Sequence, residues 1–404
     1  MASAAPEASS LAPSLLRRFH QVRDLTVALA APLSDADASA QASPEASPAK
    51  WHLAHSTWYL EAHVLAHVPG HHPVNPGFLR LFRSQPPAIR ALLTRPTLSE
   101  VLAWRGEVDA AIARHLEHLP IDWLDRALVH ELEHQERLVT DLVELFAANP
   151  LQPALYPAAP SVAAAVTTGW IRHQGGIVTI GAPHPGPDGP AHEVLLRPFR
   201  LAATLVSNAD WADFIADNGY GRAEFWSAQG WAWRQQHAVM APAHWQPLDG
   251  WWSGFSLAGR QPLNPAAPVT HISHHEALAH ARWAGARLPT EAEWEHAAAQ
   301  HDPRAGDQLD RPGPLTPGPL TPGPATLSLF GGCWQWTASA YLPHPGYTPA
   351  DPPAPDARLL GGGHMVLKGA SLATPRGSSG VSRRLPLRPD QRHMFTGLRL
   401  ARDD

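Results

Sequence analysis

Hydrophobic residues recur at helical spacing in the first 150 residues. Between residues 12 and 31 they form one apolar stripe, made of Leu15, Leu16, Phe19, Val22, Leu25 and Leu29. Further helices are predicted at 51–68, which Pro69-Gly70 ends, at 97–118, with an N-cap at Thr97 or Ser99, and at 121–148. The stretch 34–48 is small, polar and dotted with Pro, and predicts a loop. Four helices joined by loops indicate an up-down bundle, a scaffold that builds metal sites from facing helices.

The pattern changes from Trp170 onward. Short strand-like pieces, 177–180 and 194–196, are separated by loops rich in Gly, Pro and Trp, and helices are predicted at 208–217 and 274–284. The fold class is therefore two-domain α+β, with a helical bundle over 1–150, a linker over 151–169 and an irregular α+β domain over 170–404. Within the second domain a tandem Leu-Thr-Pro-Gly-Pro repeat predicts a mobile surface insertion at about 303–325.

Composition limits the classes of function. A chain of 404 residues with 44% hydrophobic residues is long enough for two cores, and its formal charge of −5 does not favour a nucleic-acid partner. One cysteine, Cys333, allows neither an intrachain disulfide nor a cysteine-based zinc cluster. The N-terminus does not resemble a signal peptide, and no run of about 18 apolar residues occurs. We expect a cytoplasmic protein without a membrane partner.

Two histidines four residues apart, His130 and His134, are the first candidate metal ligands. On a helix, positions i and i+4 lie about 40° apart on one face. The segment His130-Glu-Leu-Glu-His134 also matches the H-E-x-x-H pattern of zinc proteases, although two surface histidines on an acidic helix would look the same. A third ligand is expected from the helix at 51–68, where His55 has apolar neighbours. That helix also carries His52, His63 and His67, and the pattern alone does not choose among them.

These residues resemble a known family. The segment Ala49-Lys-Trp-His-Leu-Ala-His55, together with residues 130–136, resembles the DinB-like bundle of the ergothioneine-forming sulfoxide synthases. The second domain resembles their formylglycine-generating-enzyme-like domain, a relative of C-type-lectin-like folds. The pieces that carry this likeness follow the family order and include Val206–Phe214, Trp226–Trp233, Arg287-Leu-Pro-Thr-Glu-Ala-Glu-Trp-Glu295, Trp334-Gln-Trp-Thr337 and Gly397–Ala401.

The resemblance implies a metal, a co-substrate and an acceptor. Carried over by position, the family's Fe(II) ligands fall on three histidines, His55, His130 and His134, and O₂ is the co-substrate. The acceptor in this family is hercynine, the Nα-trimethyl derivative of histidine, which receives sulfur or selenium on the ring carbon between its two nitrogens. Glu133 occupies a position where close relatives often have a Gln that contacts the acceptor's imidazole. Glu131 and Glu133 each lie about 60° from one helix histidine, so either can flank the iron.

Three departures from the family concern the donor. Many relatives have tyrosines after Leu81-Phe82, where this chain has Arg83-Ser-Gln-Pro-Pro87, and a tyrosine in the loop that here is 358–365. The segment 382–386 also lacks an Asn that is common in relatives. A phenol can supply a proton during the reaction, so Tyr341 or Tyr347 is the predicted catalytic substitute.

Acceptor-side residues are kept and donor-side residues are rebuilt, which favours the selenoneine synthase branch, whose donor is a selenosugar. The alternative is a sulfoxide synthase that uses cysteine or γ-glutamylcysteine. The candidate substrate-binding residues are Glu133, Arg83, Arg90 and Arg384. The three arginines would favour the sulfoxide synthase alternative if they line the cavity, because arginine clamps carboxylates.

Interpretations from other classes remain open. A zinc metallohydrolase rests on H-E-x-x-H alone and explains nothing in 170–404. A zinc-dependent DinB-type thiol transferase explains only the bundle, and a formylglycine-generating oxidase needs a cysteine pair that one cysteine cannot form. A degenerate binding module would keep the fold without turnover. Bound iron, with oxygen consumed when both substrates are added, would separate the enzyme from these alternatives.

Overall fold

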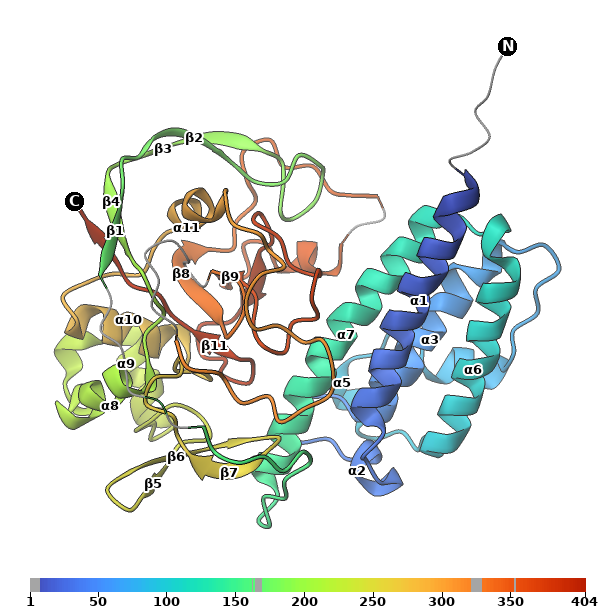
Figure 1. Ribbon diagram of the computed structural model, residues 1–404, viewed down its shortest axis with the longest axis horizontal. Coiled ribbons are helices and arrows are strands. Elements are labelled where there is room, and N and C mark those ends of the chain that lie inside the picture. Colours follow the sequence, from blue (N-terminus) through green and yellow to red (C-terminus); the bar gives the residue numbers. More distant parts are fainter. Residues whose placement is uncertain (1–7, 162, 164–168, 321–328, 352–353) are drawn as a thin grey trace. The chain divides into compact units, whose positions relative to one another are not determined.

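The computed structural model describes residues 8–161, 163, 169–320, 329–351 and 354–404 (Figure 1). The chain forms two compact units. The first unit comprises Met1–Leu155 with Asp310–Gly313, and the second comprises Tyr156–Leu309 with Pro314–Asp404. Among the described residues, no helix is both long and apolar enough to span a bilayer.

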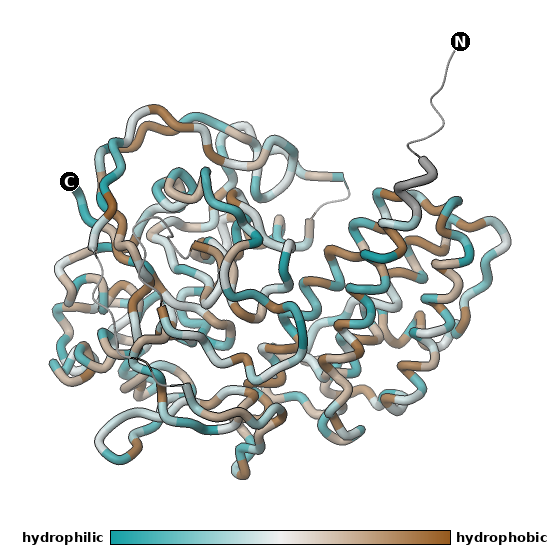
Figure 2. The backbone as a smooth tube through the Cα atoms, in the orientation of Figure 1, coloured by the Kyte–Doolittle hydropathy of each residue, from teal (hydrophilic) through white to brown (hydrophobic). Residues whose placement is uncertain are grey.

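The first unit is helical, and its four long helices are those predicted from the apolar spacing. The predicted segments 51–68 and 97–118 end in short 3₁₀ turns, Leu65–His67 and Leu116–His118, rather than in α-helix. The helices are α1 (Ala8–Ala30), α2 (Asp35–Ser39), α3 (Ala49–His63), α4 (Pro76–Leu81), α5 (Pro87–Arg90), α6 (Leu98–His115) and α7 (Ile121–Ala148). Figure 2 shows apolar and polar positions interleaved along these helices, as expected for elements that bury one face.

Capping side chains set two of the helix starts. Thr97 accepts a hydrogen bond from the backbone N–H of Glu100, whose carboxylate accepts the N–H of Thr97 in return, so Thr97 is the cap of α6. The loop predicted at 34–48 contains the short helix α2. Ser34 and Asp37 form the same reciprocal pair there, a local signal that the polar composition of the segment concealed.

Helix α3 is the central element of the first unit. It packs against α6 and α7, and all of its residues from Ala49 to Thr57 are buried. A helix that is buried on every side carries no exposed face on which histidines would simply be solvated. Polar residues on α3 must therefore find partners inside the bundle.

A buried ion network ties α1, α6 and α7 together. The Glu131 carboxylate accepts hydrogen bonds from Arg23 at 2.7 Å, from Thr26 at 2.5 Å and from Arg105. Burial alone would raise the pKa of Glu131, but the charges of Arg105 and Arg23 lower it to about 2. Of the two glutamates predicted to flank the iron, Glu131 thus serves the fold, because its carboxylate is engaged by two arginines.

The second unit is an α+β domain whose described residues form four small sheets. Strand orders are β1-β4-β12, β10-β9-β8-β11, β2-β3 and β5-β6-β7, and the pairings are antiparallel except for β8 with β11. The strands are β1 (Trp170–His173), β2 (Gly176–Ile180), β3 (His192–Leu196), β4 (Phe199–Ala202), β5 (Gln246–Leu248), β6 (Trp251–Ser256), β7 (Gly259–Pro262), β8 (Trp334–Ala340), β9 (Met365–Gly369), β10 (Leu385–Leu387), β11 (Thr396–Gly397) and β12 (Ala401–Asp403). The helices are α8 (Asn208–Ala216), α9 (Ala228–Gln236), α10 (His274–Trp283) and α11 (Glu291–Ala298), with 3₁₀ turns at Gly219–Gly221, Ala223–Phe225 and Pro355–Leu359.

The Arg-Leu-Pro-Thr-Glu-Ala-Glu-Trp-Glu block builds the core of this unit. Thr290 caps α11 and Glu293 returns the bond, while Arg287 holds the Glu293 carboxylate with two N–H donors. Trp294 is fully buried and donates its indole N–H to Gln335, and Glu295 pairs with a buried lysine of β9 at 2.9 Å. The residues of this motif that carry the family resemblance therefore have a packing role.

The predicted insertion is part of the core at its beginning. Leu309 is 2% exposed. Its backbone N–H donates to the carbonyl of Thr374, and its carbonyl accepts the backbone N–H of Arg376. Further on, Thr316 lies 3.3 Å from the hydroxyl of Ser256, and the N–H of Leu320 bonds to a carbonyl of the same unit. The remainder of the predicted insertion includes residues 321–328, which lie outside the described part.

Buried histidines of the second unit predict a pH-dependent stability. His274 donates from Nε2 to the carbonyl of Thr337 at 3.0 Å, and burial lowers the pKa of His274 to about 4. Burial also lowers the pKa of His280 to about 4. The unfolded chain protonates both residues below about pH 6.5, whereas the folded chain does so only near pH 4. Stability is thus full above pH 6.5 and falls as pH drops, by up to about 1.4 kcal/mol per pH unit for each histidine.

Hydrogen exchange of α10 measured between pH 7 and 5, corrected for the intrinsic exchange rate, tests this expectation. His274→Gln keeps a donor for Thr337 and removes the titration, so its pH dependence is expected to be shallower. The exposed His237 supplies the control His237→Gln, which should behave as wild type. An unchanged slope in His274→Gln would contradict the assignment.

Candidate metal centre

Three histidines from two helices converge inside the first unit. His55 comes from α3, and His130 and His134 come from successive turns of α7; one ring nitrogen of each lies within 4.8 Å of the others. Their ring centroids are 4.6–5.2 Å apart. The remaining histidines of the predicted helix lie elsewhere: His52 contacts His134, while His63 and His67 pack on the Trp123 ring.

The hydrogen bonds of these rings leave nitrogens free for a metal. His55 Nδ1 lies 2.6 Å from the carbonyl oxygen of Phe82, which can only accept, so Nδ1 carries the proton and Nε2 keeps its lone pair. His134 Nδ1 is engaged with His52 at 2.9 Å, which likewise leaves Nε2. His130 Nδ1 is buried and has no hydrogen-bond partner among the described residues. Three imidazoles that each keep an unprotonated ring nitrogen can bind a divalent transition metal, because imidazole nitrogen is a common ligand of such ions.

The electrostatic environment keeps these rings neutral at physiological pH. Burial lowers the pKa of His55 to about 3 and that of His130 to about 4, and it places the pKa of His134 well below the ordinary value. The charge of a neighbouring histidine adds to the effect at His55 and at His134. Neutral imidazole is the form that binds metals.

Aromatic side chains flank the cluster. Trp58 stacks on His55 with centroids 4.9 Å apart, and Tyr59 stacks on His130 at 4.2 Å. Burial raises the pKa of Tyr59 above its ordinary value; the Arg126 charge opposes this effect and the Glu133 charge adds to it. Tyr59 was not among the predicted site residues. The signal that could have identified it is its spacing of four residues from His55, one helical turn on the same face.

Two of the predicted substrate-binding residues lie near the histidines. Glu133 is half-buried on α7, and its charge raises the pKa of His130 against the larger effect of burial. The Arg90 guanidinium lies over the Trp51 ring at 4.5 Å, and Trp51 in turn stacks near His55. Burial lowers the pKa of Arg90 to about 10. Arg90 also bonds to the carbonyl of Gln85 at 2.9 Å and to Ser47.

The other predicted residues are placed differently. Arg83 is exposed on the first unit. Arg384 is buried in the second unit, where it donates to the Glu291 carboxylate and to the carbonyls of Pro187 and Leu342, so its contacts serve the fold and give a substrate role no support. Its guanidinium lies 4.7 Å from the Tyr341 ring centroid.

The two predicted tyrosines belong to the second unit. Tyr341 is buried, and its hydroxyl has no hydrogen-bond partner among the described residues. Burial raises the pKa of Tyr341 above its ordinary value. Tyr347 is partly exposed, and its N–H bonds to the carbonyl of His344. A catalytic role for either residue stays a prediction.

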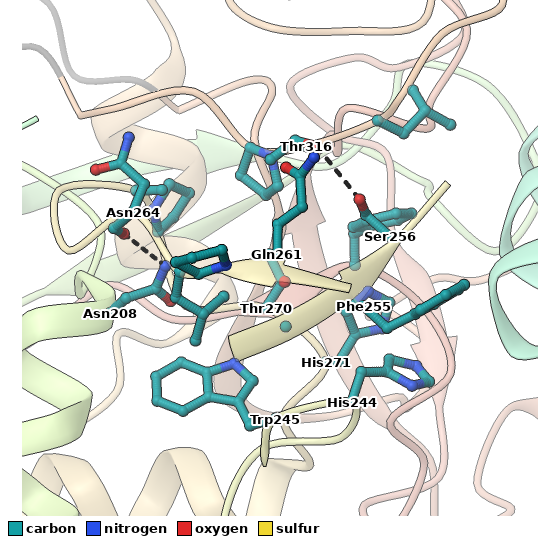
Figure 3. A pocket seen from close by; sticks show the side chains of 18 of the residues that line it. Asn208, His244, Trp245, Phe255, Ser256, Gln261, Asn264, Thr270, His271 and Thr316 are labelled. Atoms are coloured by element: carbon teal, nitrogen blue, oxygen red, sulfur yellow. Dashed lines mark hydrogen bonds between the residues drawn. The ribbon is translucent and has the colours of Figure 1, made fainter. Parts of the chain in front are cut away.

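A separate cavity occurs in the second unit (Figure 3). Its walls combine aromatic side chains, such as Trp245 and Phe255, with uncharged polar groups, such as Gln261 and Thr270. None of the predicted site residues lines it. Part of its wall, Leu315–Pro317, comes from the repeat segment.

Both units of the chain match known domain families, and the whole chain resembles known enzymes. The DinB superfamily matches residues 18–149, and the Sulfatase-modifying factor enzyme 1-like domain matches residues 157–311. The Hercynine oxygenase of Mycolicibacterium thermoresistibile is 33% identical, over 96% of this chain and 94% of that protein. The Hercynine oxygenase of Mycolicibacterium smegmatis is also 33% identical, over 91% and 94%. The Formylglycine-generating enzyme of Streptomyces coelicolor is 36% identical over only 35% of this chain.

A helical bundle with a three-histidine centre, followed by this α+β domain, defines an enzyme of the non-haem iron oxygenase class. The chain belongs to the ergothioneine-type sulfoxide synthase family. The chain's one cysteine, Cys333, is fully buried, and burial raises the pKa of its thiol to about 12, which makes it a poor nucleophile.

Proposed function

We propose that this enzyme joins selenium or sulfur to the imidazole carbon of hercynine, using Fe(II) and O₂. The observation that carries the proposal is the convergence of three neutral histidines, His55, His130 and His134, on one point of the first unit. In His55 and His134, hydrogen bonds at Nδ1 leave Nε2 free for a metal. Relatives named for hercynine, aligned along nearly the whole chain, supply the acceptor. When bound, iron supplies the redox chemistry that couples O₂ to bond formation.

The overall reaction balances without a further reductant. The ring C–H of hercynine and the Se–H or S–H of the donor are lost, and a C–Se or C–S bond forms. One oxygen atom of O₂ enters the product as selenoxide or sulfoxide and the other leaves as water. Four electrons pass to O₂, two from bond formation and two from oxidation of the selenium or sulfur.

The chain's own residues near the histidines suit such an acceptor. The carboxylate of Glu133, whose charge acts on His130, would accept an N–H from the hercynine ring. A trimethylammonium group favours aromatic surfaces, and Trp58, which stacks on His55, and Tyr59, which stacks on His130, would offer them beside the cluster. Because His55 and His134 are buried, the reaction would take place away from bulk water, which would strengthen each polar contact.

For the donor, a selenosugar is our first choice. The family's donor-side tyrosines are missing from residues 83–87 and 358–365, and Tyr59 is the only tyrosine in residues 1–155. Rebuilt donor contacts beside a retained ligand set point to a changed donor rather than to lost activity. A neutral sugar needs no arginine clamp for its recognition.

A thiol donor with a carboxylate is the second candidate, and Arg90 is the observation that favours it. Its positive charge lowers the pKa of His52 and of His55, after the larger effect of burial, which indicates that it lies close to the cluster. Cysteine or γ-glutamylcysteine would give this guanidinium a carboxylate to pair with.

Competition between donors decides between these candidates. The protein is loaded with Fe(II) under nitrogen and given hercynine, O₂ and equal amounts of cysteine, γ-glutamylcysteine, thiosugar and selenosugar, and the adducts are identified by mass spectrometry. We expect the selenosugar adduct to dominate. A cysteine or γ-glutamylcysteine sulfoxide as the main product would make the chain a sulfoxide synthase. Metal analysis showing zinc, with hydrolysis and no adduct, would contradict both.

Two variants sharpen the result. Arg90→Gln is expected to leave the KM for the selenosugar within about twofold, because that donor offers no carboxylate. If a carboxylate donor is used, the same change should raise its KM at least tenfold, the effect of losing a charged hydrogen bond of about 1.4 kcal/mol or more. The exposed Arg83, changed to Gln, is the matched control and should alter neither value.

A further inference from the structure

A hydrogen-bond chain runs from the surface side of α7 to one histidine of the cluster. Asp141 Oδ2 lies 2.9 Å from His52 Nε2, and His52 Nδ1 lies 2.9 Å from His134 Nδ1. His52 is 1% exposed, so both of its ring nitrogens depend on these two partners. The same Asp141 oxygen accepts the backbone N–H of Ser47 at 2.8 Å, just before α3 begins.

The chemistry of Asp141 fixes which atom donates in each hydrogen bond between Asp141, His52 and His134. A carboxylate can only accept, so His52 Nε2 carries a proton and donates a hydrogen bond to Asp141. Nδ1 of the neutral His52 ring is then an acceptor, and His134 Nδ1 must donate to it. His134 Nε2 is left without a proton, with its lone pair available to the cluster.

The reverse arrangement would disable the ligand. If His52 donated from Nδ1, its Nε2 would face Asp141 without a proton, and two lone-pair-bearing atoms would repel each other inside the bundle. His134 would then carry its proton on Nε2, where it could not bind a metal. The Asp141 carboxylate disfavours this state, because a buried lone pair that faces another acceptor has neither a hydrogen bond nor water to stabilise it.

We infer that His52 and Asp141 are positioning residues that hold His134 in the tautomer and orientation a metal requires, an inference that rests on the proposed ligand set. Their role is specific to one ligand. His55 has its own partner in the carbonyl of Phe82, and His130 Nδ1 has none among the described residues. Outer partners of this kind orient the histidines of metal sites and raise their basicity.

The chain of hydrogen bonds also aligns the two helices that carry the ligands. His134 and Asp141 lie seven residues apart, about two turns on one face of α7, and His52 reaches both from α3. Asp141 reaches the start of α3 through Ser47 as well. Losing either residue should therefore loosen His134 against His55 without removing a ligand.

Metal affinity of the full-length protein tests the inference without depending on turnover. Co(II), whose absorption reports histidine ligation, and Fe(II) under nitrogen are titrated into the metal-free protein, and the thermal midpoint of each metal-free variant is recorded. The ring of His52→Phe fills the space of the imidazole but cannot accept a hydrogen bond from His134. We expect this variant and Asp141→Ala each to weaken Co(II) binding about 10- to 100-fold, the usual effect of losing an outer partner of a metal ligand.

Asp141→Asn separates the acceptor from its charge. The Ser47 N–H requires an oxygen at the position of Oδ2, so the Asn side chain would present its own oxygen there and still accept from His52. We expect Asp141→Asn to weaken Co(II) binding by less than about tenfold, below the range for losing an outer partner altogether. The amide oxygen of His52→Gln can accept from His134, so the loss of affinity in that variant should fall between those of Asp141→Asn and His52→Phe.

Folded His52→Phe and Asp141→Ala proteins that bind Co(II) like wild type would overturn the inference, as would lowered thermal midpoints with unchanged affinity. A failure of the proposed function looks different. In that case the wild-type chain itself binds neither metal, or His134→Ala binds as tightly as wild type.

Discussion

His134→Ala is expected to abolish iron retention and turnover while the second unit stays folded. The substitution removes one of three nitrogens that converge within 4.8 Å, and no carboxylate completes that group among the described residues. Two histidines on different helices cannot hold a labile divalent ion through dialysis as three can. The measurement is the iron-to-protein ratio after anaerobic loading and dialysis, with product formation followed by mass spectrometry.

His67→Ala is the matched control for this experiment. His67 lies in the predicted helical segment 51–68, where by pattern it was as good a candidate for the third ligand as His55, but it is exposed and packs on Trp123 instead of joining the cluster. Its variant should keep the wild-type iron content. An unchanged iron content in His134→Ala, or a loss in His67→Ala, would show that the ligand set is wrong.

Glu131→Ala is expected to be the most destabilising single change in the first unit. It would leave Arg23 and Arg105 buried side by side without the carboxylate they share, and remove the acceptor of Thr26. Breaking a buried ion pair by deleting one partner costs about 3–5 kcal/mol, and here two cations lose the same anion. Arg23 retains Asp109 as a partner, which limits the loss on that side.

Hydrogen exchange with mass spectrometry resolves this effect within the full chain. Peptides of α1, α6 and α7 should exchange faster in Glu131→Ala by the factor that about 3–5 kcal/mol implies, on the order of 10²–10³ or more, whereas peptides of α10 should not change. Glu107→Ala on α6 is the control, because Glu107 is exposed. Uniformly wild-type exchange in Glu131→Ala would contradict the role assigned to the network.

The contrast between Glu131 and Glu133 shows where pattern reasoning ends. Both lie about 60° from a helix histidine, so spacing gives them equal claims to the metal. Helices α1 and α6 bring Arg23 and Arg105 to Glu131, and this commits its carboxylate to the bundle. No local sequence signal near Glu131 announces partners that are 26 and 108 residues away.

Arg384 shows the same limit in the second unit. Its position in a rebuilt family segment predicted a substrate contact, yet Glu291 and two carbonyls occupy it. Asp141 shows the reverse case. Its spacing of seven residues from His134 puts it on the ligand face of α7. Only the approach of His52 from α3, which bonds to both residues, connects Asp141 to the metal ligand.

The sequence by itself determined the four long helices, the α+β character of the second part and the pairing of His130 with His134. These features follow from periodicity, from capping residues and from a four-residue spacing, all of which act over a few neighbouring residues. The tertiary structure decided which histidine of α3 completes the cluster, which glutamate serves the fold and which ring nitrogens stay free. Those outcomes depend on burial and on partners distant in the chain, because a buried polar group is defined by the groups that satisfy it and not by its neighbours in sequence.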